Sequence, residues 1–119
     1  MSTGDDLRTR IVRVEGNQAT VYTAGEIDIT SAPALRSALT QCLAEGCTEL
    51  TVDMTDLEFI DSSGLGVLVW ALKQLRTREG RLVVRNPPAI AQKILGISGL
   101  SPYLDIVSSE PDVEAGGKS

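Results

Sequence analysis

Two adjacent serines are the residues of this chain best placed to take part in chemistry. Ser62 and Ser63 stand in segment 59–68, which reads FIDSSGLGVL. A serine hydroxyl becomes a catalytic nucleophile when a neighbouring base takes its proton. The chain contains no histidine, so neither a Ser-His-Asp nor a Cys-His site is possible, and imidazole-ligated metal sites and histidine phosphotransfer are excluded for the same reason. None of the three lysines, Lys73, Lys93 and Lys118, is placed by spacing as a substitute base.

Glycine-rich phosphate loops are missing as well. The sequence has no GxxxxGK[ST], no complete GxGxxG and no GxSxG motif, and these are the patterns that bind nucleotide phosphates or present a nucleophilic serine. The residues therefore count against an enzyme or a nucleotide-binding protein, and no cofactor is expected.

Segment 59–68 has the composition of a helix start, where backbone N–H groups lack partners. One interpretation is a simple cap, in which Asp61 or Ser62 accepts these hydrogen bonds. A cap needs only one such side chain, so Asp-Ser-Ser is more than capping requires. Gly64 and Gly66 each cost up to ~1 kcal/mol relative to alanine in a helix. We therefore expect both glycines to leave the backbone open to another molecule.

The helix that follows has two distinct faces at roughly 100° per residue. One face is apolar and is expected in the core: Leu65, Leu68, Val69, Leu72 and Leu75. Gly66, Val67 and Trp70 fall on the other side. An outward tryptophan beside a valine and a bare glycine is typical of a binding hot spot. The alternative is that Trp70 packs under a neighbouring helix or loop.

The elements that position this segment alternate between strands and helices. Strands are predicted at 10–14 and 18–24, joined by a turn at 15–17, and then at 49–54, at 82–84 and, weakly, at 103–107. Helices are predicted from a hydroxyl cap near Thr30 and Ser31 to Gly46, from Ser62 or Ser63 to about Arg78, and from Pro88 to Gly96, with a loop at 55–61. The order β-β-α-β-α-β-α-β favours an α/β fold with helices mainly on one face of a small mixed sheet.

Composition sets the outer limits. The 119 residues, with a formal charge of −5 and 3% aromatic residues, suit one domain at 8–108 with flexible ends at 1–7 and 109–119, and disfavour nucleic-acid binding. No signal peptide and no stretch of about 18 apolar residues is visible, so a soluble protein in a reducing compartment is expected. Cys42 is expected as a small core residue, and with Cys47 it makes neither a disulfide framework nor a zinc site.

Charge is unevenly distributed along the chain. Residues 37–72 contain acidic residues and no Lys or Arg, whereas residues 73–93 are strongly basic. One interpretation is that these charges match the dipole of the helix between them. The other is a polar docking surface for a charged partner.

Several motifs together resemble the STAS domain of bacterial anti-sigma factor antagonists. They are GEID at 25–28, LTVDM at 50–54, IDSSGLGVL at 60–68 and SGL at 98–100, and the resemblance covers about residues 8–108. It implies a small sheet flanked by helices. It also implies that the unphosphorylated protein binds an anti-sigma factor with GHKL-type serine kinase activity and so frees a sigma factor in the cytoplasm.

The resemblance assigns roles to individual residues. The second serine of the DSSG motif, Ser63, is the expected phosphorylation site, and a serine phosphatase would reverse the modification. Asp28 matches the acidic position near that serine and the partner. The expected partner-binding residues are Asp28, Asp61, Ser62, Gly64, Gly66, Val67 and Trp70. An alternative within the family is a subunit of a membrane transport complex that contacts an ATPase or permease without phosphorylation.

Overall fold

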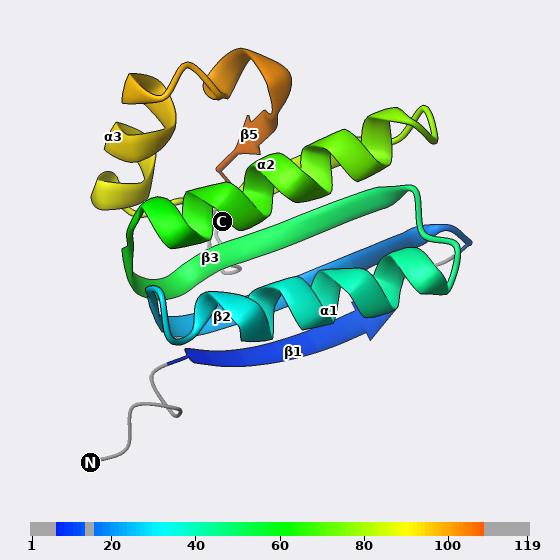
Figure 1. Cartoon of the computed structure of the whole chain (residues 1–119), viewed down its shortest axis with the longest axis horizontal. Coiled ribbons are helices and arrows are strands. Elements are labelled where there is room, and N and C mark those ends of the chain that lie inside the picture. The colour runs from blue at the N-terminus through cyan, green and yellow to red at the C-terminus, as the bar shows by residue number, and fades with distance from the viewer. Residues whose placement is uncertain (1–6, 14–15, 109–119) are drawn as a thin grey trace, which may run out of the picture.

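Strands and helices alternate along the chain as the sequence predicts, and together they form a two-layer α/β fold (Figure 1). The computed structural model describes residues 7–13 and 16–108. Residues 1–6 and 109–119, where flexible ends were predicted, lie outside the described residues, as do Val14, at the end of the first predicted strand, and Glu15, in the predicted turn. The strands are β1 (Leu7–Arg13), β2 (Gln18–Ile27), β3 (Glu49–Ile60), β4 (Arg81–Arg85) and β5 (Asp105–Val107). The helices are α1 (Ala32–Ala44), α2 (Ser62–Arg76), α3 (Ala89–Ile97) and the short 3-10 helix η2 (Ser101–Tyr103).

The five strands lie in the order β1-β2-β3-β4-β5. β1 and β2 form the predicted antiparallel hairpin, and β2, β3, β4 and β5 are parallel neighbours. Parallel neighbours need right-handed crossovers, which place the connecting helices on one face of the sheet. Figure 1 shows α1 and α2 side by side on that face, with α3 beside the start of α2. The prediction of helices mainly on one face is confirmed.

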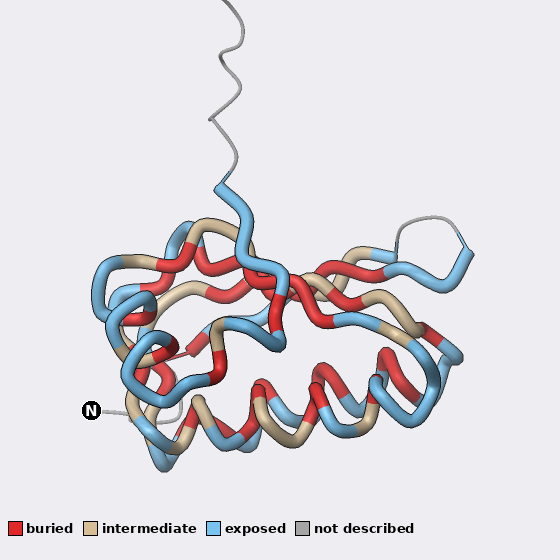
Figure 2. Tube along the Cα trace, turned by 90° about the horizontal axis from the view of Figure 1, so that it is seen from above, coloured by how far each residue is buried: buried red, intermediate tan, exposed pale blue. Residues whose placement is uncertain are grey.

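The core lies between the helix layer and the sheet. Figure 2 shows that buried helix positions recur on the side facing the strands. Val21, Val52 and Val84 are fully buried and share this face through the strand register. Cys42 is also fully buried on α1, as predicted, and burial raises the pKa of its thiol to about 11. Within the described ranges, no helix is long and apolar enough to cross a membrane.

The opposite face of the sheet is polar. We define the polar sheet face by Arg10, Tyr22, Asp53, Arg81 and Arg85, which the register places on the side away from α1 and α2. Arg85 Nε donates to Asp53 Oδ2 at 2.6 Å, and Arg10 and Arg85 flank the Tyr22 ring, with guanidinium carbons 4.5 and 5.7 Å from its centroid.

Two local predictions were wrong. The predicted loop at 55–61 is mostly strand, because β2 continues to pair with β3 up to Ile27 and Ile60 across two register shifts. The predicted hydroxyl cap of α1 is also absent, since Ser31 makes no side-chain cap hydrogen bond. The Ser31 hydroxyl donates instead to Glu26 O at 2.8 Å, and Asp28 orders the loop before the helix, where its Oδ1 accepts the N–H of Thr30 and of Ser31.

Candidate functional site

The ends of β2 and β3 bring two carboxylates to the start of α2. Ile27 and Ile60 are register partners, and the N–H of Asp61 donates to Ile27 O at 3.1 Å. Asp28 and Asp61 directly follow these residues, and paired strands lie about 4.8 Å apart. The sheet therefore places Asp28 next to the serines that open α2. We call Asp28, Asp61, Ser62 and Ser63 the Ser63 rim.

Asp61 is the cap of α2, as one of the sequence interpretations proposed. Its Oδ1 accepts the N–H of Ser63 at 2.8 Å, and its carbonyl accepts the N–H of Leu65. Ser62 is exposed and Ser63 is half-buried. Within residues 7–13 and 16–108, no hydrogen bond engages either serine hydroxyl. Both hydroxyls are therefore available to a second molecule, since neither is used by the fold.

Asp28 is held by its own loop. Its Oδ1 accepts the Thr30 hydroxyl at 2.7 Å and the N–H groups of Thr30 and Ser31 at 3.0 and 3.1 Å. The hydrogen bond from the Thr30 hydroxyl, together with those from the N–H groups, lowers the pKa of Asp28 and outweighs the opposing effect of desolvation. Asp28 is therefore ionised at neutral pH.

No cation neutralises the rim in the described part of the chain. The ion pairs there lie elsewhere and join Arg13 to Glu45, Arg81 to Glu49 and Asp105, and Arg85 to Asp53. The two rim carboxylates are thus satisfied by neutral N–H and hydroxyl donors. The start of α2 presents unpaired negative charge to the solvent.

The two glycines of α2 have opposite environments. Gly64 is buried, and a Cβ added there would lie 2.6 Å from Ile27 Cγ2 and 2.7 Å from Ile60 Cγ1. The expectation that Gly64 opens the backbone to another molecule was wrong, because this glycine allows α2 to sit against the ends of β2 and β3. Gly66 is exposed, with nothing within 4 Å of an added Cβ. The expectation of open backbone is confirmed for Gly66.

The helical-wheel prediction also needs correction. Val67 is buried, with 7% of its surface exposed, so it belongs to the core rather than to the outer face. Leu65 and Val69, predicted as core, are half-buried at its margin. Trp70 is half-buried and packs against the core, while the Arg36 guanidinium of α1 lies over its ring at 4.3 Å. The packed interpretation of Trp70 is therefore the better one, although part of the ring remains exposed.

Sequence reasoning passed over Ile29. It follows Asp28 in the β2–α1 loop and is 75% exposed. An aliphatic side chain at the tip of a loop beside charged residues is a suitable anchor for a partner. The available signal was an apolar isoleucine that lies outside both the predicted strand at 18–24 and the predicted helix that begins near Thr30.

Known proteins with similar sequence or structure point to one family. A family model for the STAS domain matches residues 9–113. The anti-sigma-B factor antagonist of Bacillus subtilis is 37% identical over 95 residues, which cover 80% of this chain and 86% of that protein.

Two solved structures share the fold. The unphosphorylated form of the anti-sigma factor antagonist SpoIIAA has a TM-score of 0.77 at 21% identity and covers 90% of this chain and 92% of its own. The phosphorylated form of the Bacillus cell fate determinant SpoIIAA has a TM-score of 0.73 at 22% identity, covering 90% and 96%. Both forms of that protein thus have the architecture described above.

Proposed function

Because the chain belongs to the STAS domain family, we propose that it is an anti-sigma factor antagonist controlled by phosphorylation of Ser63. Its unphosphorylated form binds an anti-sigma factor and so releases a sigma factor in the cytoplasm. The observation that carries this proposal is the Ser63 rim, where free serine hydroxyls lie at the start of α2 among unpaired carboxylates. The homologous B. subtilis protein supports this function over that of a transport-complex subunit.

Phosphorylation would change the rim mainly through charge and bulk. An anti-sigma factor with GHKL-type serine kinase activity transfers the γ-phosphoryl group of ATP to Ser63 Oγ. The hydroxyl proton leaves to a base of the kinase, and ADP departs. Phosphate adds about −1.5 to −2 charges, close to the ionised Asp28 and to Asp61. The start of a helix accommodates such an anion, so the free protein changes little, while the partner meets added bulk and a charge beyond those of Asp28 and Asp61 that its surface matches.

The unphosphorylated and the phosphorylated SpoIIAA structures both share the fold of this chain, which supports an effect of phosphate that needs no change of architecture. The partner-binding residues proposed for the rim are Asp28, Asp61 and Ser62, with Gly66 and the exposed part of Trp70 further along α2. Ile29 extends this set from the adjacent loop. Gly64 and Val67 act from beneath it, by seating the helix. A serine phosphatase would remove the phosphate and restore binding.

Phosphorylation and binding together test the proposal. Each anti-sigma factor with a GHKL-type kinase domain from the source genome is incubated with the chain and ATP, and the product is mapped by mass spectrometry. We expect phosphate on Ser63 in the wild type and in Ser62→Ala, and none on that site in Ser63→Ala. If no such kinase modifies Ser63, the proposal is overturned.

Calorimetry with the same anti-sigma factor separates the two states. Ser63→Ala should bind as the wild type does, whereas Ser63→Asp should bind at least about tenfold more weakly, because a larger side chain and a carboxylate with no matching cation would lie in the contact. Amide spectra of the free protein before and after phosphorylation should differ only near the start of α2. A global change in these spectra would contradict the local mechanism.

A further inference from the structure

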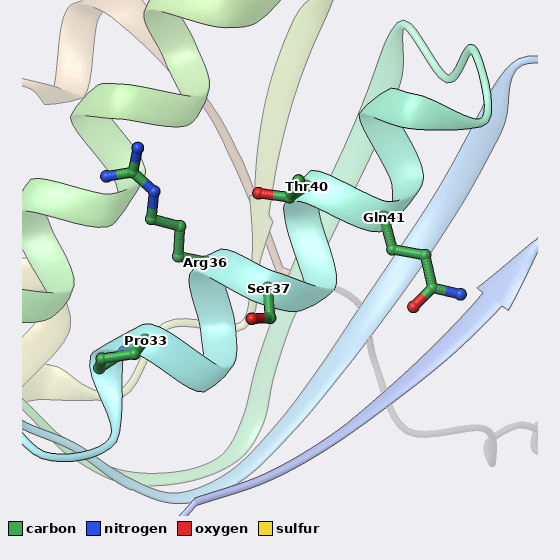
Figure 3. Close-up of a pocket in the computed structure, with 5 residues that line it drawn as sticks. All are labelled: Pro33, Arg36, Ser37, Thr40 and Gln41. Carbon is green, nitrogen blue, oxygen red and sulfur yellow. The ribbon is translucent and has the colours of Figure 1, made fainter.

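The outer surface of α1 has a shallow hollow close to the proposed partner site. The hollow has a volume of about 440 Å³ and is lined by Pro33, Arg36, Ser37, Thr40 and Gln41, which we call the α1 hollow. Figure 3 shows these side chains along one side of the helix, with Arg36 reaching toward α2 and Gln41 pointing away from it. All five residues are exposed. None of them belongs to the buried hydrophobic core.

Arg36 connects this hollow to the Ser63 rim. Its guanidinium lies 4.3 Å from the centroid of the Trp70 ring. Ser63, Gly66 and Trp70 follow one another at spacings of three and four residues on α2, so they share one face of that helix. The rim, the open backbone at Gly66 and the α1 hollow therefore form one continuous surface across the two helices.

The chemistry of Arg36 indicates what this end of the surface binds. Arg36 is the only charged side chain within α1 (Ala32–Ala44). No carboxylate lies within ion-pair distance of it in the part of the chain that the structure describes. Stacking on Trp70 occupies a face of the guanidinium and leaves its edge N–H donors for a planar bidentate acceptor. A carboxylate is the protein group that fits these donors.

We infer that the α1 hollow is a second contact for the anti-sigma factor and that it binds an acidic segment of that partner, with a carboxylate on Arg36. This inference rests on the proposed function and extends its surface away from the phosphorylated serine. The surface then has two signs, negative at Asp28 and Asp61 and positive at Arg36. Such an arrangement fixes the orientation of a partner and raises its association rate.

Calorimetric binding of the unphosphorylated full chain to the anti-sigma factor tests this contact. Arg36→Glu should weaken binding about tenfold or more. Arg36→Lys should weaken it less, because the positive charge remains while the paired N–H donors of the guanidinium are lost. The loss should shrink at high salt. The matched control is Arg10→Glu, since Arg10 also stacks on an aromatic ring, Tyr22, but on the polar sheet face; it should bind as the wild type does. Circular dichroism verifies that both glutamate variants are folded.

Two readouts separate failure of the inference from failure of the proposed function. A wild type that neither binds nor becomes phosphorylated overturns both. A wild type that binds, with Arg36→Glu equally tight or Arg10→Glu equally weakened, overturns only the α1 contact. Sedimentation of the chain alone provides a further check: if Arg36→Glu abolishes a self-associated form seen in the wild type, the hollow binds a second copy and the inference is wrong. We expect the same sedimentation for both proteins.

Discussion

Carboxylates at the Ser63 rim and on the polar sheet face are used in different ways. On the sheet face, Asp53 pairs with Arg85 at 2.6 Å and is 6% exposed. At the rim, Asp28 and Asp61 accept hydrogen bonds from backbone N–H groups of their own segments. The charge of Asp53 is neutralised within the fold. The charges of the rim are left for another molecule.

This difference shows how one small domain separates stability from recognition. A carboxylate that accepts hydrogen bonds from backbone N–H groups stabilises the backbone through its acceptor oxygens, and an uncharged amide oxygen would do this almost as well. A carboxylate beside an arginine serves through its charge. A substitution of aspartate by asparagine, which removes the charge but keeps an acceptor oxygen, should therefore lower stability on the polar sheet face and leave stability nearly unchanged at the Ser63 rim.

The largest expected effect concerns the packing of α2 against the ends of β2 and β3, beneath the Ser63 rim, rather than the charge of the rim. Gly64→Ala places a methyl group 2.6 Å from Ile27 Cγ2 and 2.7 Å from Ile60 Cγ1, and overpacking of this kind lowers the free energy of unfolding by about 1–3 kcal/mol. Gly66→Ala meets open space and should raise it by up to ~1 kcal/mol through helix propensity. Urea unfolding of both variants measures the contrast. Equal effects at the two glycines would show that α2 is not seated on the strand ends as described.

The next effect tests the polar sheet face. Asp53→Asn should lower the free energy of unfolding by about 1–2 kcal/mol, because Arg85 loses a charge-assisted hydrogen bond in a mostly buried position. Asp105→Asn is the control, since Asp105 pairs with Arg81 and both side chains are more than half exposed, at 51% and 53%; it should change stability by less than ~0.5 kcal/mol. If both variants lose the same stability, Asp53 is no more than a surface charge.

The same pair predicts a pH dependence. Burial raises the pKa of Asp53, but hydrogen bonds from Arg85 and Thr55 outweigh it, and the net pKa lies below the ordinary value of 3.8. A lowered folded-state pKa stabilises the fold fully above the unfolded value, and this contribution is lost as the pH falls through the folded value. The free energy of unfolding of the wild type should therefore fall more steeply with decreasing pH than that of Asp53→Asn below about pH 4. If the free energies of unfolding of the two proteins fall in parallel as the pH is lowered, the lowered pKa of Asp53 is contradicted.

Patterns along the chain predicted most of the fold. Alternation in β1 and β2 and the three- and four-residue spacing in α1 and α2 were sufficient, because burial imposes these periods directly. The end of β3 was missed because Thr55, Asp56 and Glu58 have the composition of a loop, and only pairing with β2 makes this segment a strand.

The site was predicted less completely than the fold. Asp61 as a cap and Gly66 as open backbone follow from local chemistry alone. Gly64 and Val67 were misplaced because their surroundings come from distant segments: Ile27 lies on β2, far from α2 in the sequence. Arg36 over Trp70 joins two helices and leaves no trace in the sequence of either one. Contacts of this kind need the tertiary structure.

The smallest expected effect on stability gives the sharpest test of the comparison. Asp61→Ala removes the cap on Ser63 N–H and should lower the free energy of unfolding by about 1 kcal/mol. Asp61→Asn keeps an acceptor oxygen at the same place and should change it by no more than ~0.5 kcal/mol, unlike Asp53→Asn. Thermal and urea unfolding of the three variants measure these changes in stability, and calorimetry with the anti-sigma factor measures the effect of Asp61→Asn on binding. Weakened binding by Asp61→Asn at unchanged stability would assign the rim charge to recognition, whereas a stability loss equal to that of Asp53→Asn would remove the distinction between the two regions.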